Sequence, residues 1–149
     1  MNLLPVPREM DFGTALVSPG EPRVDIGAHE LPAEGYRLRI DPDGSVYIDA
    51  ADSAGAFYAQ CTLTQLTRLH GGRVPVGSVR DWPDLATRGV MLDISRDKVP
   101  TMETLRALVD RLAEWKVNHL ELYAEHTFAY RDHEVVWRNA SPMTATEVR

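Results

Sequence analysis

Side chains that could bind or protonate a substrate follow an apolar run in the segment RGVMLDISRD, residues 88–97. Asp93, Arg96 and Asp97 come directly after Val90-Met91-Leu92. An arginine offers five N–H donors in a fixed geometry for hydroxyls or carboxylates, and a carboxylate can orient a group or transfer a proton. The segment is therefore either a strand that has reached the surface or the rim of a binding site.

A second group of polar residues has the same relation to a second apolar run. Glu125 and His126 follow the stretch HLELY, residues 119–123. If the two runs are parallel strands, both groups lie at the same sheet edge, where α/β barrels carry their active sites. Asp93, Arg96, Glu125 and His126 are thus candidate site residues. Strand ends are polar in most α/β proteins, however, so a purely structural Arg–Asp pair stays open.

Other chemistry has little support in the sequence. It contains no HExxH, no paired CxxC and no glycine-rich phosphate loop. His126 and His133 are seven residues apart without a nearby cysteine, which is a poor zinc signature. Cys61 is the single cysteine, so no internal disulfide can form, and we expect it to be a small apolar residue on a helix. We predict no metal and no cofactor.

The bulk composition is that of an ordinary globular protein. The chain has 149 residues, 44% of them hydrophobic and 26% charged, and a formal net charge of −6. That balance favours neither nucleic acid nor an anionic membrane as a partner. The first residues, MNLLPVPREMDFG, lack the pattern of a signal peptide, and no segment approaches the roughly 20 apolar residues of a membrane helix. We therefore predict a cytoplasmic location.

A β-hairpin is predicted from residue 36 onward. YRLRI (36–40) alternates between apolar and polar residues, DPDG (41–44) has the residues of a tight turn, and SVYIDA (45–50) forms the second strand. We expect an antiparallel pair with Arg37 and Arg39 on its solvated face.

A helix follows the hairpin. Residues 52–72 have apolar side chains at helical spacing, Asp52 or Ser53 can cap the first turn, and Gly71-Gly72 ends it. The predicted buried stripe comprises Ala59, Thr62, Leu63, Leu66 and Leu69.

The flanking segments are harder to interpret. Leu3-Leu4 and residues 24–26 are candidate edge strands, because the prolines around them argue against central ones. RVPVGSVRDWP, residues 73–83, contains a proline and is predicted to be an edge strand or a connector. Strands around one helix predict a small α+β domain with an antiparallel or mixed sheet over residues 1–82.

Residues 83–149 have a different pattern. GVMLDI (89–94) is apolar throughout, which is typical of a strand buried on both faces. Thr101 can cap a helix, and HLELY is a second strand, so the segment predicts a parallel βαβ unit. The buried stripe of that helix is expected to comprise Leu105, Leu108, Val109 and Leu112.

The last residues, SPMTATEVR, predict the start of another helix. Ser141 can cap it, Pro142 suits its first turn, and Glu147 stands three residues after Thr144. A βαβ unit with a third element just starting cannot close a parallel sheet. We therefore expect a fragment that contains one small domain and the beginning of a larger one, and its exposed edges predict a possible homodimer. The alternative is a compact full-length protein whose last helix is short.

Two contiguous blocks resemble a known family. EGYRLRIDPDGSVYIDAADSAGAFYAQCTLTQL resembles the small domain that precedes the barrel in family 20 glycoside hydrolases, the β-N-acetylhexosaminidases. DWPDLATRGVMLDISRDKVPTMETLRALVDRLAEWKVNHLELY resembles the start of their catalytic barrel. The resemblance covers about residues 30–125. It implies a zincin-like fold without zinc for the first domain, followed by the truncated start of a (β/α)8 barrel.

The resemblance also implies a chemistry. In the family, the arginine that matches Arg96 binds hydroxyls of a terminal N-acetylhexosamine, and the substrate's own acetamido oxygen attacks the anomeric carbon. An adjacent Asp–Glu pair assists, and by family order it lies beyond Arg149, so this chain is expected to carry no catalytic residue and to be inactive alone. Many members have an Asp-Asp pair where this chain has Glu125 and His126, which leaves the roles of these two residues open.

The implied partner is a glycan or glycoconjugate that carries N-acetylhexosamine. Two other interpretations remain. The small domain could be a non-catalytic module that binds carbohydrate or protein, or the parent could be a related barrel enzyme with another sugar specificity.

Overall fold

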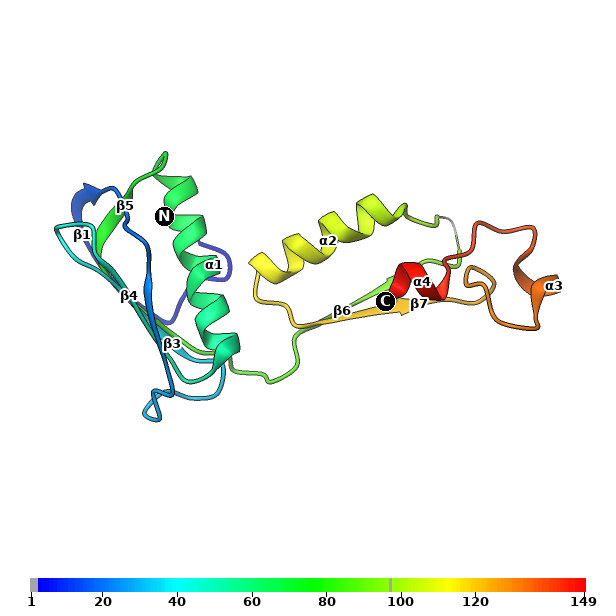
Figure 1. Ribbon diagram of the computed structural model, residues 1–149, viewed down its shortest axis with the longest axis horizontal. Coiled ribbons are helices and arrows are strands. Elements are labelled where there is room, and N and C mark those ends of the chain that lie inside the picture. The colour runs from blue at the N-terminus through cyan, green and yellow to red at the C-terminus, as the bar shows by residue number, and fades with distance from the viewer. Residues whose placement is uncertain (1–2, 97) are drawn as a thin grey trace. The chain divides into compact units, whose positions relative to one another are not determined.

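The computed structural model describes residues 3–96 and 98–149, and its elements are shown in chain order in Figure 1. Within the described residues, no helix has the length and apolar character needed to span a membrane. The chain divides into two compact units, each formed by two stretches of sequence. The first comprises Met1–Ala86 and Glu114–Lys116, and the second comprises Thr87–Ala113 and Val117–Arg149.

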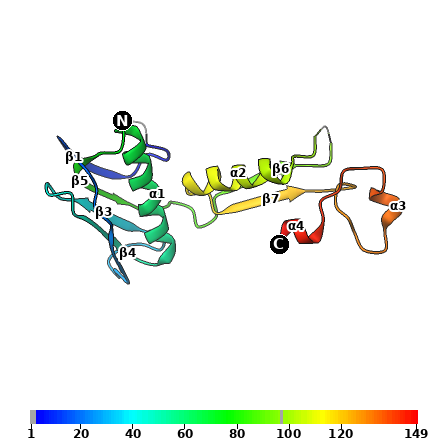
Figure 2. The ribbon, with the colours of Figure 1, turned by 45° about the horizontal axis from the view of Figure 1, so that its top comes forward.

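The first unit is a five-stranded mixed sheet with one helix, α1 (Ser53–Leu69), on one face (Figure 2). Its strand order is β1-β5-β3-β4-β2, and only β2 and β4 run parallel. The unit is the small α+β domain with a mixed sheet that the sequence predicted. The strands are β1 (Glu9–Val17), β2 (Arg23–Ile26), β3 (Tyr36–Ile40), β4 (Val46–Ala50) and β5 (Val74–Asp81).

The predicted hairpin is confirmed as β3 and β4. Leu38 pairs with Ile48, and both side chains are buried in the core beneath α1. Arg39 lies on the opposite, exposed face, as the alternation predicted. Gly44 closes the turn with a φ of 87°, a conformation that favours glycine, and its N–H donates to the carbonyl of Asp41 at 2.9 Å.

The helix α1 begins and packs largely as predicted. Asp52 is its N-cap, and the side chain accepts a hydrogen bond from the Gly55 N–H. The predicted stripe is buried except for Leu69, which lies in the last turn and is 48% exposed, so that part of the prediction is wrong. Cys61 is buried on the same helix.

The segment predicted as an edge strand or connector is an interior strand. β5 lies between β1 and β3, so the prediction for residues 73–83 is wrong. Pairing of β5 with β3 ends at Gly77, and Pro75 lies beyond that point, opposite Leu16 of β1. The missing N–H of Pro75 therefore costs no ladder bond to β3, which explains how an interior strand accommodates it.

The first residues differ from the prediction as well. Leu3-Leu4 is not a strand: Leu3 is buried in the core, and the Leu4 N–H donates to the Gln65 side chain at 2.9 Å. The edge strand of this region is β1 instead, which no sequence pattern had indicated. Residues 24–26 do form an edge strand, as part of β2.

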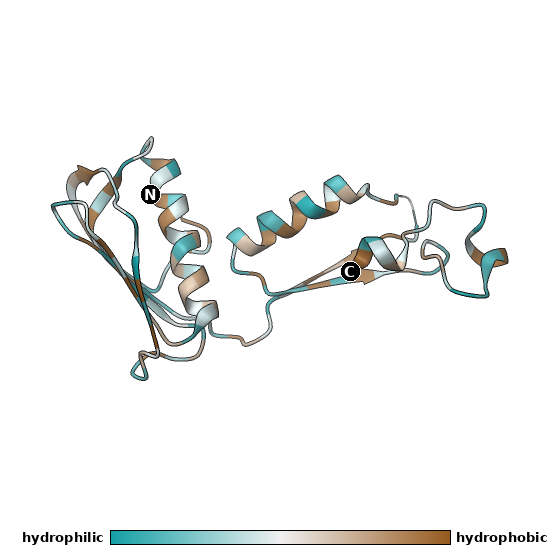
Figure 3. Cartoon of the chain, viewed as in Figure 1, coloured by the Kyte–Doolittle hydropathy of each residue, from teal (hydrophilic) through white to brown (hydrophobic). Residues whose placement is uncertain are grey.

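The second unit contains a parallel βαβ segment. β6 and β7 pair in parallel, from Gly89 opposite His119 to Asp93 opposite Tyr123. Along the helix between them, hydrophobic and hydrophilic residues alternate (Figure 3), and Leu105 packs with Ile94 and Met143 in a small core. The elements are β6 (Gly89–Asp93), α2 (Met102–Glu114), β7 (His119–Tyr123), α3 (Glu134–Trp137) and α4 (Ala145–Val148).

Apolar side chains in this unit are more exposed than their sequence pattern predicted. Met91 in β6 is 59% exposed, and Val109 in α2 is also exposed. The described sheet has two strands and one long helix, which cannot cover both of its faces, so the prediction of a strand buried on both sides is wrong for this chain.

The last predicted helix begins later than expected. α4 starts after Thr144, whose side chain and that of Glu147 form a reciprocal capping box. The Thr144–Glu147 pairing is thus confirmed, whereas the predicted cap at Ser141 is wrong. Ser141 lies before Met143, which still contributes to the core as part of an extended segment.

Candidate functional site

The candidate site lies where β6 and β7 end. Because the two strands are parallel and Asp93 pairs with Tyr123, the loops that follow them leave from the same sheet edge. The N–H of Ile94 donates to the carbonyl of Tyr123 at 3.0 Å and extends the pairing by one step. The sheet register therefore sets how the two loops lie against each other.

Asp93 shapes the loop after β6. Its Oδ1 accepts hydrogen bonds from the backbone N–H groups of Ser95, at 2.9 Å, and Arg96, at 3.3 Å. An aspartate that bonds to the backbone two and three residues later turns the chain in a defined way. This local turn is what presents the side chain of Arg96 at the sheet edge.

The Arg96 guanidinium lies between two carboxylates. Nη1 is 3.3 Å from Asp93 Oδ2, and Nη2 is 3.7 Å from Glu125 Oε1. The guanidinium carbon also lies 5.4 Å from the centre of the Tyr123 ring. The arginine side chain is 67% exposed, so these ion pairs contribute little to stability, and their effect is to orient the guanidinium.

Glu125 is held by the same two loops. Tyr123 Oη donates to its carboxylate at 2.9 Å, and this hydrogen bond raises the pKa of the tyrosine. The Glu125 N–H donates to Ser95 Oγ, which is also 3.2 Å from Thr127 Oγ1. Ser95 and Thr127 are buried and join the two loops beneath the charged residues.

The structure brings together three of the four candidate residues. Asp93, Arg96 and Glu125 form one cluster, whereas His126 is exposed and, within the described residues, has no hydrogen bond or ion pair to it. Asp97, named with them in the sequence, lies outside the described residues. Thr127 had not been singled out, because no sequence signal distinguishes a buried threonine from an exposed one.

A groove adjoins the cluster. It is lined by Asp93 and Arg96, by residues 98–101 of the segment before α2, and by side chains of β6 and α2, and much of this lining is apolar. The polar side chains among them can exchange hydrogen bonds with hydroxyl groups, and the apolar ones can contact carbon atoms of a ligand. Among residues 3–96 and 98–149, no three histidine, cysteine or acidic side chains gather as a metal site would require.

Comparison with known proteins shows the family to which the chain belongs. A family model described as glycosyl hydrolase family 20, domain 2, matches residues 2–82. The chain is 31% identical over 104 residues to a β-hexosaminidase of Akkermansia muciniphila, a match that covers 68% of this chain and 21% of that protein. It is 35% identical over 111 residues to a β-N-acetylhexosaminidase of Cellulomonas fimi, covering 71% of this chain and 22% of that protein. The chain thus spans about a fifth of the length of these relatives.

Solved structures share its fold. A crystal structure of a β-N-acetylhexosaminidase superposes with a TM-score of 0.78 at 25% identity, covering 93% of this chain and 31% of that one. A family 20 β-N-acetylglucosaminidase gives a TM-score of 0.67 at 30% identity, over 87% of this chain and 32% of that one. For the β-N-acetylhexosaminidase of Bacteroides fragilis the TM-score is 0.83 at 18% identity, over 98% and 41%, which is a likeness of fold alone. Because the family model matches more than half of its residues, this chain belongs to glycosyl hydrolase family 20.

Proposed function

We propose that the chain is the amino-terminal part of a β-N-acetylhexosaminidase that removes terminal N-acetylglucosamine or N-acetylgalactosamine from glycans. The observation that carries the proposal is the family 20 domain 2 match, followed by a parallel β6–β7 pair that holds Arg96 at its carboxyl edge. The relatives are named as hexosaminidases and a diacetylchitobiase, and one solved neighbour is described in complex with N-acetylglucosamine. In this proposal β6 and β7 are the first strands of a (β/α)8 barrel.

Arg96 has the role of a binding residue. A guanidinium oriented by two carboxylates can donate to sugar hydroxyls while its own charge stays compensated. Charged donors typically contribute about 1.5–3 kcal/mol each to such hydrogen bonds. Asp93 and Glu125 would then be accessory residues that orient Arg96, whereas His126 is exposed and is given no role in this proposal.

The reaction itself would be carried out elsewhere in the polypeptide. Retaining hydrolysis by the substrate's acetamido group needs one carboxylate to orient that group and one acid to protonate the leaving oxygen. A well-held intramolecular nucleophile can lower a barrier by roughly 7–11 kcal/mol. The sequence contains no adjacent Asp-Glu pair. We therefore propose that these 149 residues bind the sugar weakly and do not hydrolyse it.

An activity assay tests this assignment. We expect no release of nitrophenol from 4-nitrophenyl N-acetyl-β-D-glucosaminide by the 149-residue chain, and release by the same chain expressed within its longer reading frame. In the active polypeptide, Arg96→Ala should raise KM by about 10- to 150-fold, since it removes a charged donor to the sugar. The control, Arg39→Ala, removes an exposed arginine of the first unit and should leave KM unchanged. Turnover by the 149 residues alone would refute the proposed division of roles.

We also propose that the isolated chain associates with a second copy. Met91 and Val90 expose apolar surface on β6, and within the described residues β6 and β7 each pair on one side only. Unpaired strand edges with apolar side chains favour pairing between molecules.

A further inference from the structure

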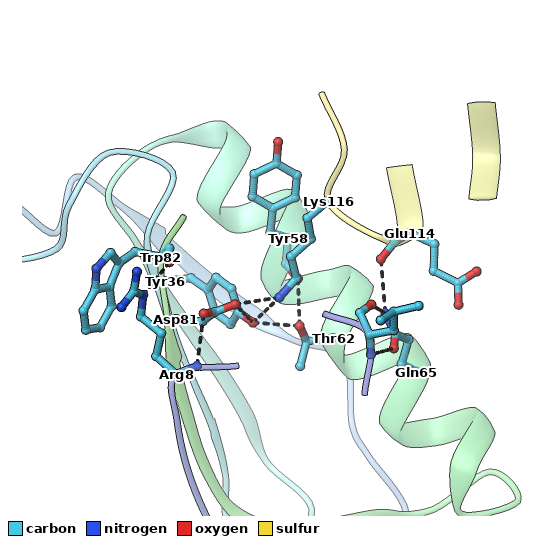
Figure 4. A network of polar contacts seen from close by, with 10 residues as sticks. Arg8, Tyr36, Tyr58, Thr62, Gln65, Asp81, Trp82, Glu114 and Lys116 are labelled. Atoms are coloured by element: carbon cyan, nitrogen blue, oxygen red, sulfur yellow. Dashed lines mark hydrogen bonds and ion pairs between the residues drawn. The ribbon is translucent and has the colours of Figure 1, made fainter. Parts of the chain in front are cut away.

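A charged pair is buried inside the first unit, and it includes none of the candidate site residues. Lys116 is 6% exposed and Asp81 is 8% exposed, and no other charged side chain of the described residues is buried to this degree. Tyr36 and Thr62, which surround the pair, are almost completely buried (Figure 4). Burying an ion pair is costly unless every partner is placed to compensate it, so this arrangement needs an explanation.

The lysine ammonium donates hydrogen bonds to Asp81 and Tyr36. Nζ lies 2.8 Å from Asp81 Oδ2 and 2.9 Å from Tyr36 Oη, and 4.9 Å from the centre of the Tyr36 ring. The other Asp81 oxygen accepts a hydrogen bond from the Arg8 N–H at 3.2 Å. The carboxylate is thus paired at both oxygens.

The direction of the hydrogen bonds explains why Tyr36 accepts from the ammonium. Thr62 Oγ1 donates to the carbonyl of Tyr58 at 3.1 Å, which leaves it able to accept the Tyr36 proton at 2.7 Å, and Tyr36 Oη can also donate to Asp81 Oδ2 at 3.4 Å. Burial, together with the charge of Asp81, raises the pKa of Tyr36, which keeps the phenol protonated. The Tyr36 oxygen therefore presents a lone pair where Nζ lies. A carboxylate, a lone pair and an aromatic ring together fit a primary ammonium group.

The acceptors and the donor come from distant parts of the sequence. Asp81 and Tyr36 lie within residues 2–82, which the family model matches, whereas Lys116 follows α2 and belongs to the short segment Glu114–Lys116 of this unit. The Gln65 side chain donates to the carbonyl of Glu114 at 3.1 Å, and this hydrogen bond also holds the segment Glu114–Lys116 against α1. Residues 2–82 thus supply a site that they do not themselves fill.

We propose that Tyr36, Thr62 and Asp81 form a binding site for a primary alkylammonium group, and that Lys116 fills it as an intramolecular ligand. The first unit is then complete only when the ammonium is in place. Removing one partner of a buried pair leaves the other charge unpaired. We therefore expect loss of Lys116 to raise the unfolding equilibrium constant of the first unit by about 100- to 5,000-fold.

Chemical rescue of the full 149-residue chain tests the proposal. The Lys116→Ala variant lacks three methylenes and the ammonium, which together correspond to n-propylammonium. We expect this variant to unfold at lower urea concentration, and added n-propylammonium to raise its midpoint. Propanol, which lacks the charge, and tetramethylammonium, which lacks N–H donors, should have no such effect. The unmutated chain should not respond to any of the three. Absence of a specific response to n-propylammonium would overturn the binding-site assignment.

Two further variants complete the test. Arg68→Ala removes an exposed cation that pairs with Glu114 at 2.6 Å, and it should change the unfolding constant less than about fivefold. If Lys116→Ala does not fold, the double variant Asp81→Asn with Lys116→Met decides the matter, because it removes both charges. A double variant that is more stable than Lys116→Met alone supports the proposal. Equal instability of the two, or a Lys116→Met chain as stable as Arg68→Ala, contradicts it.

Discussion

The chain contains two pairs of a basic side chain and an aspartate that lie in different surroundings. Arg96 and Asp93 meet in solvent, where their attraction is screened and the guanidinium stays available to a ligand. Lys116 and Asp81 meet in the interior, where burying either charge without the other would cost free energy. The two pairs thus differ chiefly in exposure, because one lies at the surface and the other is buried.

A third acidic residue, Asp52, acts through backbone N–H groups. Its carboxylate accepts from Gly55 N at 2.9 Å, as the N-cap of α1, and from Glu34 N at 2.8 Å. Burial alone would raise the pKa of Asp52, but these hydrogen bonds outweigh it and lower the pKa. One side chain therefore joins the helix start to the loop before β3.

Replacing Asp52 should weaken the first unit in a pH-dependent way. We expect Asp52→Ala to cost about 1–2 kcal/mol near neutral pH, measured by urea unfolding. Because the folded-state pKa lies below the unfolded value of about 3.9, the contribution is fully present above that pH and is lost as the pH falls through the folded-state pKa. The difference in free energy of unfolding between the variant and the parent chain should thus become smaller in acid. Asp52→Asn, which keeps one acceptor but does not titrate, is the control. A gap that stays constant down to about pH 2 would contradict the assignment.

The candidate site was predictable in part. Asp93, Arg96 and Glu125 follow apolar runs whose length indicates strands, so their meeting at one edge follows from parallel pairing alone. The buried contact between Ser95 and Thr127 depends on how two loops pack, which local sequence does not encode. Lys116 was missed for the same reason, since nothing near it in sequence indicates its partner.

At the scale of elements, local patterns predicted local structure. The β3–β4 hairpin and α1 were predictable, because alternation, a turn sequence and a capping aspartate all act within a few residues. The position of β5 in the sheet depends on β1, far away in sequence, and Pro75 alone indicated an edge. Patterns of polarity therefore predicted which segments form elements better than where those elements pair.

The start of α1 also depends on a close approach that propensity does not predict. Gly55 is buried in the first turn, and a Cβ there would lie 2.3 Å from the carbonyl oxygen of Gly35. That carbonyl accepts a hydrogen bond from Ala51 at 3.0 Å, so it cannot move without cost.

We expect Gly55→Ala to destabilise the first unit by about 1–3 kcal/mol, because a backbone atom must shift. Helix propensity alone would predict a gain of about 1 kcal/mol. The control is Gly13→Ala in β1, where the added carbon would lie 3.7 Å from its nearest neighbour and should be tolerated. Thermal unfolding followed by circular dichroism distinguishes the two expectations. A Gly55→Ala chain more stable than the parent would contradict the prediction, because it would mean that the Gly35 backbone moves aside at little cost.

At the scale of the whole molecule, the two units differ in how much apolar surface they bury. The first has a continuous core between its sheet and α1, whereas the core of the second centres on Ile94, Leu105 and Met143. A smaller core leaves more of the strands in contact with solvent.

Self-association should therefore arise from the second unit. We expect the average mass of the chain, measured by sedimentation velocity, to rise toward that of a dimer with concentration. Met91→Lys should weaken this association by about tenfold or more, since a charged residue on a strand opposes edge pairing. Val135→Lys, at an exposed apolar position in α3, is the matched control and should have little effect. A single monomeric species at high concentration would argue against this proposal.

The register of the first sheet also constrains the order in which a nascent polypeptide can fold. β1 pairs with β5, so Glu9 can form its hydrogen bond only after Arg80, 71 residues later, has been made. Asp81 must wait a further 35 residues for Lys116. As the chain leaves the ribosome, the hairpin and α1 can assemble early. β1 stays unpaired until β5 has emerged, and Asp81 stays without its ammonium partner until Lys116 has emerged. Emergence of residue 116 from the ribosome is thus the earliest point at which the first unit can reach its final stability.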